Sequence, residues 1–429
     1  MTVTGIGADG WAGLAPRSAA AIEQADVVVG GPRQLALLPD SVAGRRIPLP
    51  SPLLPGLPEL VAEHGGATAG SGATAGSGAT AGGGATAGDG ATAGDGPTAG
   101  DGRLVVLASG DPMFYGIGST LIRLLGPERV RVLPHPSSVS LAAARLGWPL
   151  DDVDVVSLVG RPLELLHPAL QPGRRVLALV AESTAAAGIR ALLDARGFGA
   201  SPVTVLADLG GPAEAVGPAD GQPHSRLAIV AIDGRLDPGR APLPRTPGLP
   251  EDAFEEDGQI TKREIRALAL AALAPVPGQL LWDVGAGSGS IGIEWMRSHP
   301  ASRAIAVEPR ADRRDRIARN AAALGVPGLV VIPGTAPGAL SGLPRPDAVF
   351  IGGGVTAEGV VGACWDALHP GGRLVANAVT IEGEIALAGW HRELGGTLTR
   401  VAVERAGGLG GFTAWRPALP VVQWSARKS

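Results

Sequence analysis

Residues 280–309 read LLWDVGAGSGSIGIEWMRSHPASRAIAVEP, and this stretch decides the fold of the chain. An apolar run, a glycine-rich turn, a helical stretch and a second apolar run that ends at Glu308 follow one another. This order predicts half of a nucleotide-binding βαβ unit. The glycines let the backbone turn sharply and approach a ligand, the helix start offers free N–H groups, and Glu308 can accept hydrogen bonds from a ribose.

Two ligand classes fit this turn. The spacing Gly287-x-Gly289-x-x-Gly292 satisfies the dinucleotide fingerprint. The spacing Asp283-x-Gly285-x-Gly287-x-Gly289 satisfies the acidic glycine loop that is typical of S-adenosylmethionine (SAM) methyltransferases. An acidic residue at the strand end suits the cationic ammonium and sulfonium of SAM and repels a pyrophosphate. The residues therefore favour SAM over a nicotinamide or flavin nucleotide, and a turn that binds nothing is the third alternative.

The composition is that of a globular protein. Its 429 residues are enough for about two to three domains. The formal net charge of −4 argues against nucleic-acid binding. Cys364 is the single cysteine, which excludes an internal disulfide and a cysteine-based zinc cluster. The start MTVTGIGADG lacks the pattern of a signal peptide, and no apolar run reaches the roughly 18 residues of a membrane span, so we expect a cytoplasmic protein with no membrane partner.

The first part of the chain, residues 1–233, alternates apolar strands with helices, which predicts a parallel α/β architecture. Gly5-x-Gly7 follows the first strand. Ser109-Gly110-Asp111-Pro112 stands where a later strand meets a helix, the usual ligand edge of such a sheet. Residues 65–102 interrupt this part with hexapeptides such as GATAGS and GATAGD, which carry no large apolar side chain, so we expect a disordered insertion there.

A second domain is predicted over residues 251–429, after a proline-rich linker at 234–250. It opens with a helix over 261–273, for which Thr261 is the expected N-cap and Glu264 completes a capping box. Strands and helices then alternate.

The last two strands of this domain, 398–403 and 420–425, are expected to form an antiparallel hairpin. Seven strands in this order are the usual architecture of SAM-dependent methyltransferases.

Longer motifs connect both parts to known families. Residues 249–382 contain LPEDAF, ITKREIRALAL, WDVGAGSGSIGIEW, PGTAPGAL, DAVFIGGG and GGRLVANAVTIE, and they resemble the cobalamin-pathway methyltransferases that methylate carbon 15 of a precorrin and decarboxylate a neighbouring acetate. Residues 1–233 contain TGIGADG, VVGGPRQ, LASGDPMFYGIG, HPSSVSLAAARLG and SLVGR, and they resemble the tetrapyrrole methylases that act on carbon 5. The resemblance implies a tetrapyrrole-methylase fold of two α/β subdomains, followed by a Rossmann-like, seven-stranded class I SAM methyltransferase domain.

The same resemblance implies a bifunctional enzyme of cobalamin biosynthesis. Its substrate would be a precorrin-6 tetrapyrrole, methylated at carbons 5 and 15 and decarboxylated at the ring C acetate to give precorrin-8. It would use SAM at two sites and no metal, and we expect a homo-oligomer without nucleic-acid partners. Two alternatives stay open: a nicotinamide-dependent oxidoreductase, which should open its nucleotide domain with a strand rather than a helix, and a SAM-binding regulatory protein without turnover.

The resemblance also carries over site residues. In the second domain, SAM is expected to contact the opening helix, the glycine loop and the two strand ends that follow, at Thr261, Asp283, Gly285, Ala286, Gly287, Ser288, Gly289, Glu308 and Ala336. In the first domain, SAM is expected between the two subdomains, at Gly5, Gly7, Gly110, Asp111, Ser137 and Ser138. The family commonly has aspartate where this chain has Thr335, which leaves that polar contact beside adenine open.

A substrate with many carboxylates should meet basic side chains at the rim of its site. The candidates are Lys262, Arg263 and Arg266 in the second domain, Arg33 and Arg161 in the first, and, as a weaker one, Asn377 at a strand end. A solvated charge, or a turn-forming role for Asn377, is the alternative for each. Five arginines within residues 310–319 are expected to form a solvated helix face. Methyl transfer from a sulfonium mainly needs alignment and a dry site, so no catalytic acid or base is assigned.

Overall fold

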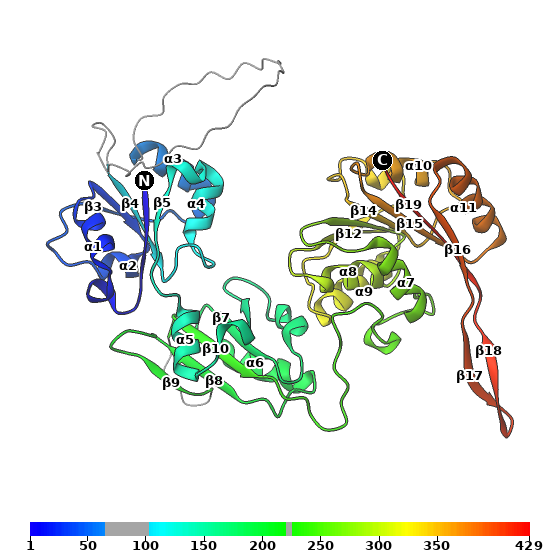
Figure 1. The fold of residues 1–429 in the computed structure, drawn as a ribbon, viewed down its shortest axis with the longest axis horizontal. Helices are drawn as coiled ribbons and strands as arrows, with labels where there is room; N and C mark the ends of the chain where they lie inside the picture. Colours follow the sequence, from blue (N-terminus) through cyan, green and yellow to red (C-terminus); the bar gives the residue numbers. More distant parts are fainter. Residues whose placement is uncertain (65–102, 220–224) are drawn as a thin grey trace, which may run out of the picture. The chain divides into compact units, whose positions relative to one another are not determined.

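The computed structural model describes residues 1–64, 103–219 and 225–429, and the glycine-rich repeat lies outside these residues. The chain divides into two compact units, Met1–Asp152 with Thr204–Ile229, and Val153–Val203 with Val230–Ser429. Figure 1 labels the helices and strands of the chain. Short 3₁₀ helices lie at Gly10–Gly13, Pro127–Arg129, Leu150–Asp152, Leu163–Ala169, Glu251–Ala253 and Gly338–Leu340.

The first sheet is entirely parallel and has the strand order β3-β2-β4-β1-β5. Its strands are β1 (Thr2–Ile6), β2 (Val27–Gly30), β3 (Arg45–Pro48), β4 (Leu104–Ser109) and β5 (Arg131–Leu133). The helices among them are α1 (Pro16–Glu23), α2 (Pro32–Ala36), α3 (Leu53–His64), α4 (Ile117–Leu125) and α5 (Ser138–Leu146). Val3 and Val106 pack in one apolar cluster, and Ile6 and Leu107 pack in another. Both faces are therefore covered, as a parallel sheet requires.

A second five-stranded sheet has the order β6-β7-β10-β8-β9. Its strands are β6 (Val153–Ser157), β7 (Arg175–Val180), β8 (Val203–Ala207), β9 (Ala215–Pro218) and β10 (Ala228–Asp233), and α6 (Ala185–Ala195) follows β7. β6 and β7 pair in parallel, whereas β8 and β9 are antiparallel.

The third sheet has seven strands in the order β13-β12-β11-β14-β15-β19-β16. Its strands are β11 (Leu280–Val284), β12 (Arg303–Glu308), β13 (Val330–Pro333), β14 (Ala348–Ile351), β15 (Arg373–Ala378), β16 (Thr397–Val401) and β19 (Val421–Arg427). The helices around it are α7 (Arg263–Leu273), α8 (Ser290–Ser298), α9 (Ala311–Ala323), α10 (Val360–Ala367) and α11 (Ile381–Leu394). The first five strands run parallel, and β19 is antiparallel to both of its neighbours. The predicted alternation of strands and helices is confirmed.

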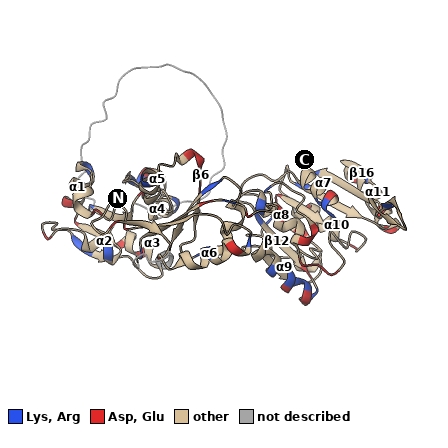
Figure 2. Ribbon diagram, turned by 90° about the horizontal axis from the view of Figure 1, so that it is seen from below, with Lys and Arg blue, Asp and Glu red and all other residues tan. Residues whose placement is uncertain are grey.

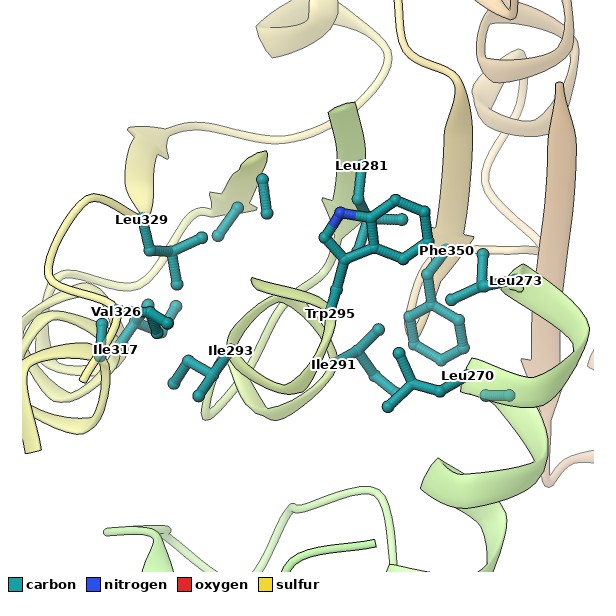
Figure 3. Packing of buried hydrophobic residues seen from close by; sticks show 14 of the residues in the cluster. Leu270, Leu273, Leu281, Ile291, Ile293, Trp295, Ile317, Val326, Leu329 and Phe350 are labelled. Carbon is teal, nitrogen blue, oxygen red and sulfur yellow. The ribbon is translucent and has the colours of Figure 1, made fainter. Parts of the chain in front are cut away.

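Two apolar layers cover this sheet. On one face, Leu270 and Leu273 of α7 lie beside Phe350 of β14 and Trp295 of α8 (Figure 3). Trp295 has no exposed surface, so α7 and α8 hold a dry wall against the strands. The opposite face packs in a second cluster, which includes the fully buried single cysteine, Cys364, on α10.

Two local predictions for this domain were wrong. α7 begins at Arg263, and its N-cap is Lys262, which makes no side-chain capping bond; Thr261 therefore does not cap the helix. The antiparallel pairing of the last strands is confirmed for β16 and β19, but they are not joined by a simple turn. A two-stranded ribbon of β17 (Glu404–Leu409) and β18 (Phe412–Pro417) stands between them in the sequence.

The arginines of α9 are not a purely solvated face. Arginines and aspartates both lie along this helix (Figure 2). Arg313 and Arg316 both pair with Asp257, at 2.9 and 3.1 Å, and their side chains are only 15% exposed. The hydrogen bond from Arg313 is the main cause that lowers the pKa of Asp257 to about 2. Sequence reasoning missed this pairing, because the partners are more than 50 residues apart.

Candidate functional site

A cavity of about 910 Å³ opens at the carboxyl edge of the seven-stranded sheet. Its walls come from the loop before α7 and from the segments that follow β11, β12, β13, β14 and β15. This is the edge at which parallel α/β sheets bind their ligands. The volume falls in the range usual for small-molecule sites. All the expected SAM residues of the second domain line this cavity except Gly289, which is the N-cap of α8.

The glycine loop after β11 needs its glycines for different reasons. Gly285, Gly287 and Gly289 have φ angles of 71°, 59° and 76°, the left-handed region that favours glycine. A Cβ on Gly285 would also lie 3.0 Å from the backbone nitrogen of Gly353, whereas a Cβ on Gly287 would meet nothing nearer than 3.7 Å. The loop therefore turns sharply beneath Gly287 and leaves space on its cavity side.

Two buried carboxylates hold this loop. Oε2 of Glu308 accepts a 2.9 Å hydrogen bond from the backbone N–H of Gly287, and Oε1 accepts one of 3.1 Å from that of Arg310. Oδ2 of Asp283 accepts a 2.9 Å hydrogen bond from the backbone N–H of Gly292 in α8. Glu308 thus fixes the loop at the strand end where a ribose would lie, and Asp283 fixes the start of the helix.

Burial changes the charge of Asp283. Its removal from water raises the pKa of Asp283 to about 7, and the nearby Glu308 adds to the rise. Near neutral pH about half of the Asp283 carboxyl groups are therefore protonated. The attraction for a cationic ligand that the sequence assigned to Asp283 is correspondingly reduced.

Arg266 does not lie at the rim, so this expectation was wrong. Its side chain is fully buried, and its Nε lies 2.5 Å from Oε1 of Glu294. Its other nitrogens donate to the carbonyls of Thr261 and Leu249. Glu294 in turn accepts from the backbone N–H groups of Gly248 and Leu249. The pair therefore anchors both ends of the segment that forms one cavity wall.

Of the other predicted substrate-binding residues, some line the cavity and some do not. Lys262 lines the cavity, with its Nζ 3.3 Å from Oε2 of Glu251. Arg263 is exposed and is not among the lining residues. Asn377 does line the cavity. Arg161 is exposed in the turn after β6.

Sequence reasoning missed Arg405. It lies on β17, lines the cavity, and pairs with Glu264 and, at 3.6 Å, with Glu251. It belongs to the ribbon that was not predicted, more than 100 residues beyond the helix that it contacts. A basic residue at this spacing carries no sequence signal of its own.

The glycine positions of the first domain meet at three neighbouring strand ends. A Cβ on Gly5, in β1, would lie 2.0 Å from the carbonyl oxygen of Gly110, after β4, and 2.7 Å from Cβ of His135, after β5. A Cβ on Gly7 would lie 2.6 Å from Nε2 of His135 and 2.5 Å from Oδ1 of Asp9. These glycines permit close packing of the chain itself.

The other expected residues of this site have local partners. Oδ1 of Asp111 accepts a 2.8 Å hydrogen bond from the backbone N–H of Met113. Ser137 is the N-cap of α5, with its Oγ 3.1 Å from the backbone nitrogen of Ser140, and Ser138 is the first residue of that helix. The structure therefore brings Gly5, Gly110 and the start of α5 to one sheet edge.

Three further features belong to the part of the chain that the structure describes. Within the described ranges, no group of three or more His, Cys, Asp or Glu residues could hold a metal ion. In the same ranges, no helix is long and apolar enough to cross a membrane. The element that opens the glycine-loop domain is the helix α7, whereas the oxidoreductase alternative predicted a strand there.

Known protein families match both halves of the chain. The family described as tetrapyrrole (corrin/porphyrin) methylases matches residues 1–221, and the precorrin methyltransferase domain matches residues 252–428. The chain is 46% identical to a precorrin-6Y C(5,15)-methyltransferase (decarboxylating) of a Sinorhizobium species, over 100% of this chain and 96% of that protein. It is 44% identical to the protein of the same name from Mycobacterium tuberculosis, over 100% of both.

A solved structure is also similar. It is the C-terminal domain of precorrin-6Y C5,15-methyltransferase from Rhodobacter capsulatus, 48% identical, covering 43% of this chain and 99% of that one, with a TM-score of 0.41. Since the full-length relatives match from end to end at well over 30% identity, the chain belongs to the family of SAM-dependent, decarboxylating precorrin-6Y C(5,15)-methyltransferases.

Proposed function

We propose that this chain methylates a precorrin-6 at carbons 5 and 15 and removes the ring C acetate carboxylate as carbon dioxide, in cobalamin biosynthesis. The observation that carries the proposal is the end-to-end identity of 46% with a relative of that name. The cavity at the glycine loop supports it, because its lining matches the residues expected to hold SAM.

The proposal divides the work between the halves. The second domain would methylate carbon 15 and decarboxylate, with SAM bound between the glycine loop and Glu308, whose carboxylate is already fixed by the N–H groups of Gly287 and Arg310. The first domain would methylate carbon 5, with a second SAM at the edge where Gly5, Gly110 and Ser137 meet. The family match to residues 1–221 supports this second role.

Methyl transfer from SAM requires little acid–base catalysis from the protein. When bound, SAM supplies an electrophilic methyl group. The chain has to orient the tetrapyrrole and keep water away from the reacting carbon. The wall formed by α7 and α8 supports the second task, because Ile265 of α7 and Ile291 of α8 line the cavity with apolar side chains. Lys262 and Arg405, at the cavity, are the cations proposed to meet substrate carboxylates.

The test is a mass measurement of the product. The purified chain is incubated with labelled SAM and reduced precorrin-6, beside a control enzyme of known activity. Gain of two methyl groups with loss of carbon dioxide is expected. SAM binding without methyl transfer, while the control enzyme is active, would contradict the proposal and favour the regulatory alternative.

We also propose that the chain assembles as a homo-oligomer. The ribbon of β17 and β18 exposes Leu409, Phe412 and Trp415 by 63, 82 and 70%. Apolar side chains so exposed on a narrow ribbon are typical of surfaces that another chain covers. Light scattering of the whole chain should give more than one copy, and Phe412→Ser with Trp415→Ser should lower that mass.

A further inference from the structure

The side-chain amides of Asn377 and Gln423 form a hydrogen-bonded pair, and the NH₂ group of Asn377 has no acceptor among the described residues. Asn377 of β15 lines the cavity. Its Oδ1 accepts a 3.1 Å hydrogen bond from Nε2 of Gln423, the residue directly opposite on β19. Its Nδ2 is buried and has no hydrogen-bond partner among the residues that the structure describes. A buried donor without an acceptor is unfavourable and calls for an explanation.

The pair lies on the cavity side of the sheet. Side chains alternate between the faces along a strand, so Asn377 shares its face with Val375, which packs in the cluster around α7. Residues opposite each other on paired strands share a face, so Gln423 lies there as well. On this side the cavity is lined by Thr261 and by Ile265 of α7. Asn377 is partly exposed at this lining, so a small shift of its side chain would bring the buried NH₂ group to a ligand in this part of the cavity.

In the structure, Nε2 of Gln423 donates to Oδ1 of Asn377, so the oxygen end of the Asn377 amide is occupied. The NH₂ group of Asn377 then remains for another partner. Gln423 is only 9% exposed, which keeps water from competing for this bond.

The position of the pair indicates which ligand the donor meets. β15 is three strands away from β12 in the order β12-β11-β14-β15, which is about 14 Å at the usual strand spacing. Glu308, at the end of β12, is the proposed ribose partner, so Asn377 lies at the far side from the nucleoside. Since the relatives are named for a decarboxylation, their substrate carries at least one carboxylate, which is an acceptor for N–H donors.

We propose that Asn377 donates a hydrogen bond to a carboxylate oxygen of the tetrapyrrole substrate, and that Gln423 is a positioning residue that turns the amide donor toward it. The inference rests on the proposed function, gives the predicted candidate Asn377 a specific ligand group, and adds Gln423. Asn377 contacts the substrate, whereas Gln423 acts only through Asn377. The donor favours a carboxylate because an amide oxygen at the same place would repel it.

Two near-isosteric variants test this arrangement in the whole chain. Asn377→Asp keeps the bond from Gln423 but presents an anionic oxygen in place of the NH₂ group. Gln423→Glu removes the donor, so the Asn377 amide turns and presents its oxygen instead. Each should raise the KM for the precorrin in the decarboxylating methylation by about 10- to 100-fold, with a smaller change in kcat and an unchanged Kd for SAM. Thr399→Val, opposite Gln423 on β16, is the matched control and should change none of these values.

The outcomes separate this inference from the proposed function. An unchanged KM in both variants overturns the role of the pair while leaving the enzyme assignment intact. A parallel loss of SAM affinity also overturns it, because the donor would then serve the nucleoside side. A wild-type chain that transfers no methyl group to the precorrin contradicts the proposed function itself.

Discussion

The two glycine motifs of this chain look alike in sequence but work differently. After β11, three glycines in one loop adopt left-handed φ angles, and Gly287 faces open space. At the end of β1, neither Gly5 nor Gly7 has a positive φ. A side chain on Gly5 would instead collide with the backbone after β4. The first motif shapes a turn for a ligand, and the second lets three strand ends come together.

A glycine spacing in the sequence therefore does not show why each glycine is required. One glycine is needed for a left-handed φ angle, and another because a Cβ would collide with its neighbours. A loop glycine such as Gly287, which has space for a Cβ, can be replaced by alanine at the cost of backbone strain. Gly5 cannot be replaced in this way, because the atom nearest to its Cβ position is the main-chain carbonyl oxygen of Gly110. Three measurements can break or sharpen this distinction.

The largest effect is expected for Gly5→Ala. Its Cβ would lie 2.0 Å from the Gly110 carbonyl oxygen, which cannot move without shifting the strand end. We expect a loss of at least about 3 kcal/mol in the free energy of unfolding of the first domain. Gly287→Ala is the matched control, and its left-handed φ should cost only about 1–2 kcal/mol. Differential scanning calorimetry measures both, and equal losses would remove the distinction.

An intermediate effect is expected for Glu308→Ala. Loss of the proposed ribose contacts should weaken SAM binding at the glycine loop by about 10- to 100-fold. The site in the first domain should keep its affinity, because its glycines meet at a different sheet. Isothermal titration of the whole chain should then resolve one strong and one weak site. Glu382→Ala, exposed in the first turn of α11, serves as control. An unchanged isotherm for Glu308→Ala would reject the ribose role.

The smallest effect concerns Asp283. Because the folded state raises the pKa of this carboxyl to about 7, the folded chain holds a proton that the unfolded chain releases near pH 4. The stability from this proton is complete below pH 4 and is lost as the pH rises through 7. Between pH 6 and pH 8, the wild type should lose about 1.4 kcal/mol relative to Asp283→Asn. Urea unfolding at both pH values checks this, and parallel curves for the two proteins would contradict it.

The sequence predicted most of the second domain because its signals are local. The glycine loop, the acidic strand end at Glu308 and the helix ahead of the loop each lie within a short window. The lining of the cavity by Thr261, Lys262 and Ala336 could be anticipated from family motifs for the same reason.

What sequence reasoning missed depends on distant pairs. Arg266 was predicted to bind substrate at the rim of the site, because it is a basic residue near the glycine loop. Its buried ion pair with Glu294 shows that it stabilises the fold instead. Arg405 reaches the cavity because an unpredicted ribbon returns toward α7. Gln423 has no motif, and its importance follows from the register of β15 and β19. These contacts are set by packing, which a single sequence does not encode in any one window.

The buried Cys364 has a practical consequence. Burial raises the pKa of its thiol to about 12, so at neutral pH only on the order of one part in 10⁵ is reactive thiolate. Thiol reagents should therefore not modify Cys364 in the native chain. A pair of cysteines introduced at exposed sites, one in each half, could be labelled with fluorophores without first removing Cys364. Energy transfer between the labels would report, molecule by molecule, whether the two methylating halves approach each other as the tetrapyrrole passes through its successive reactions.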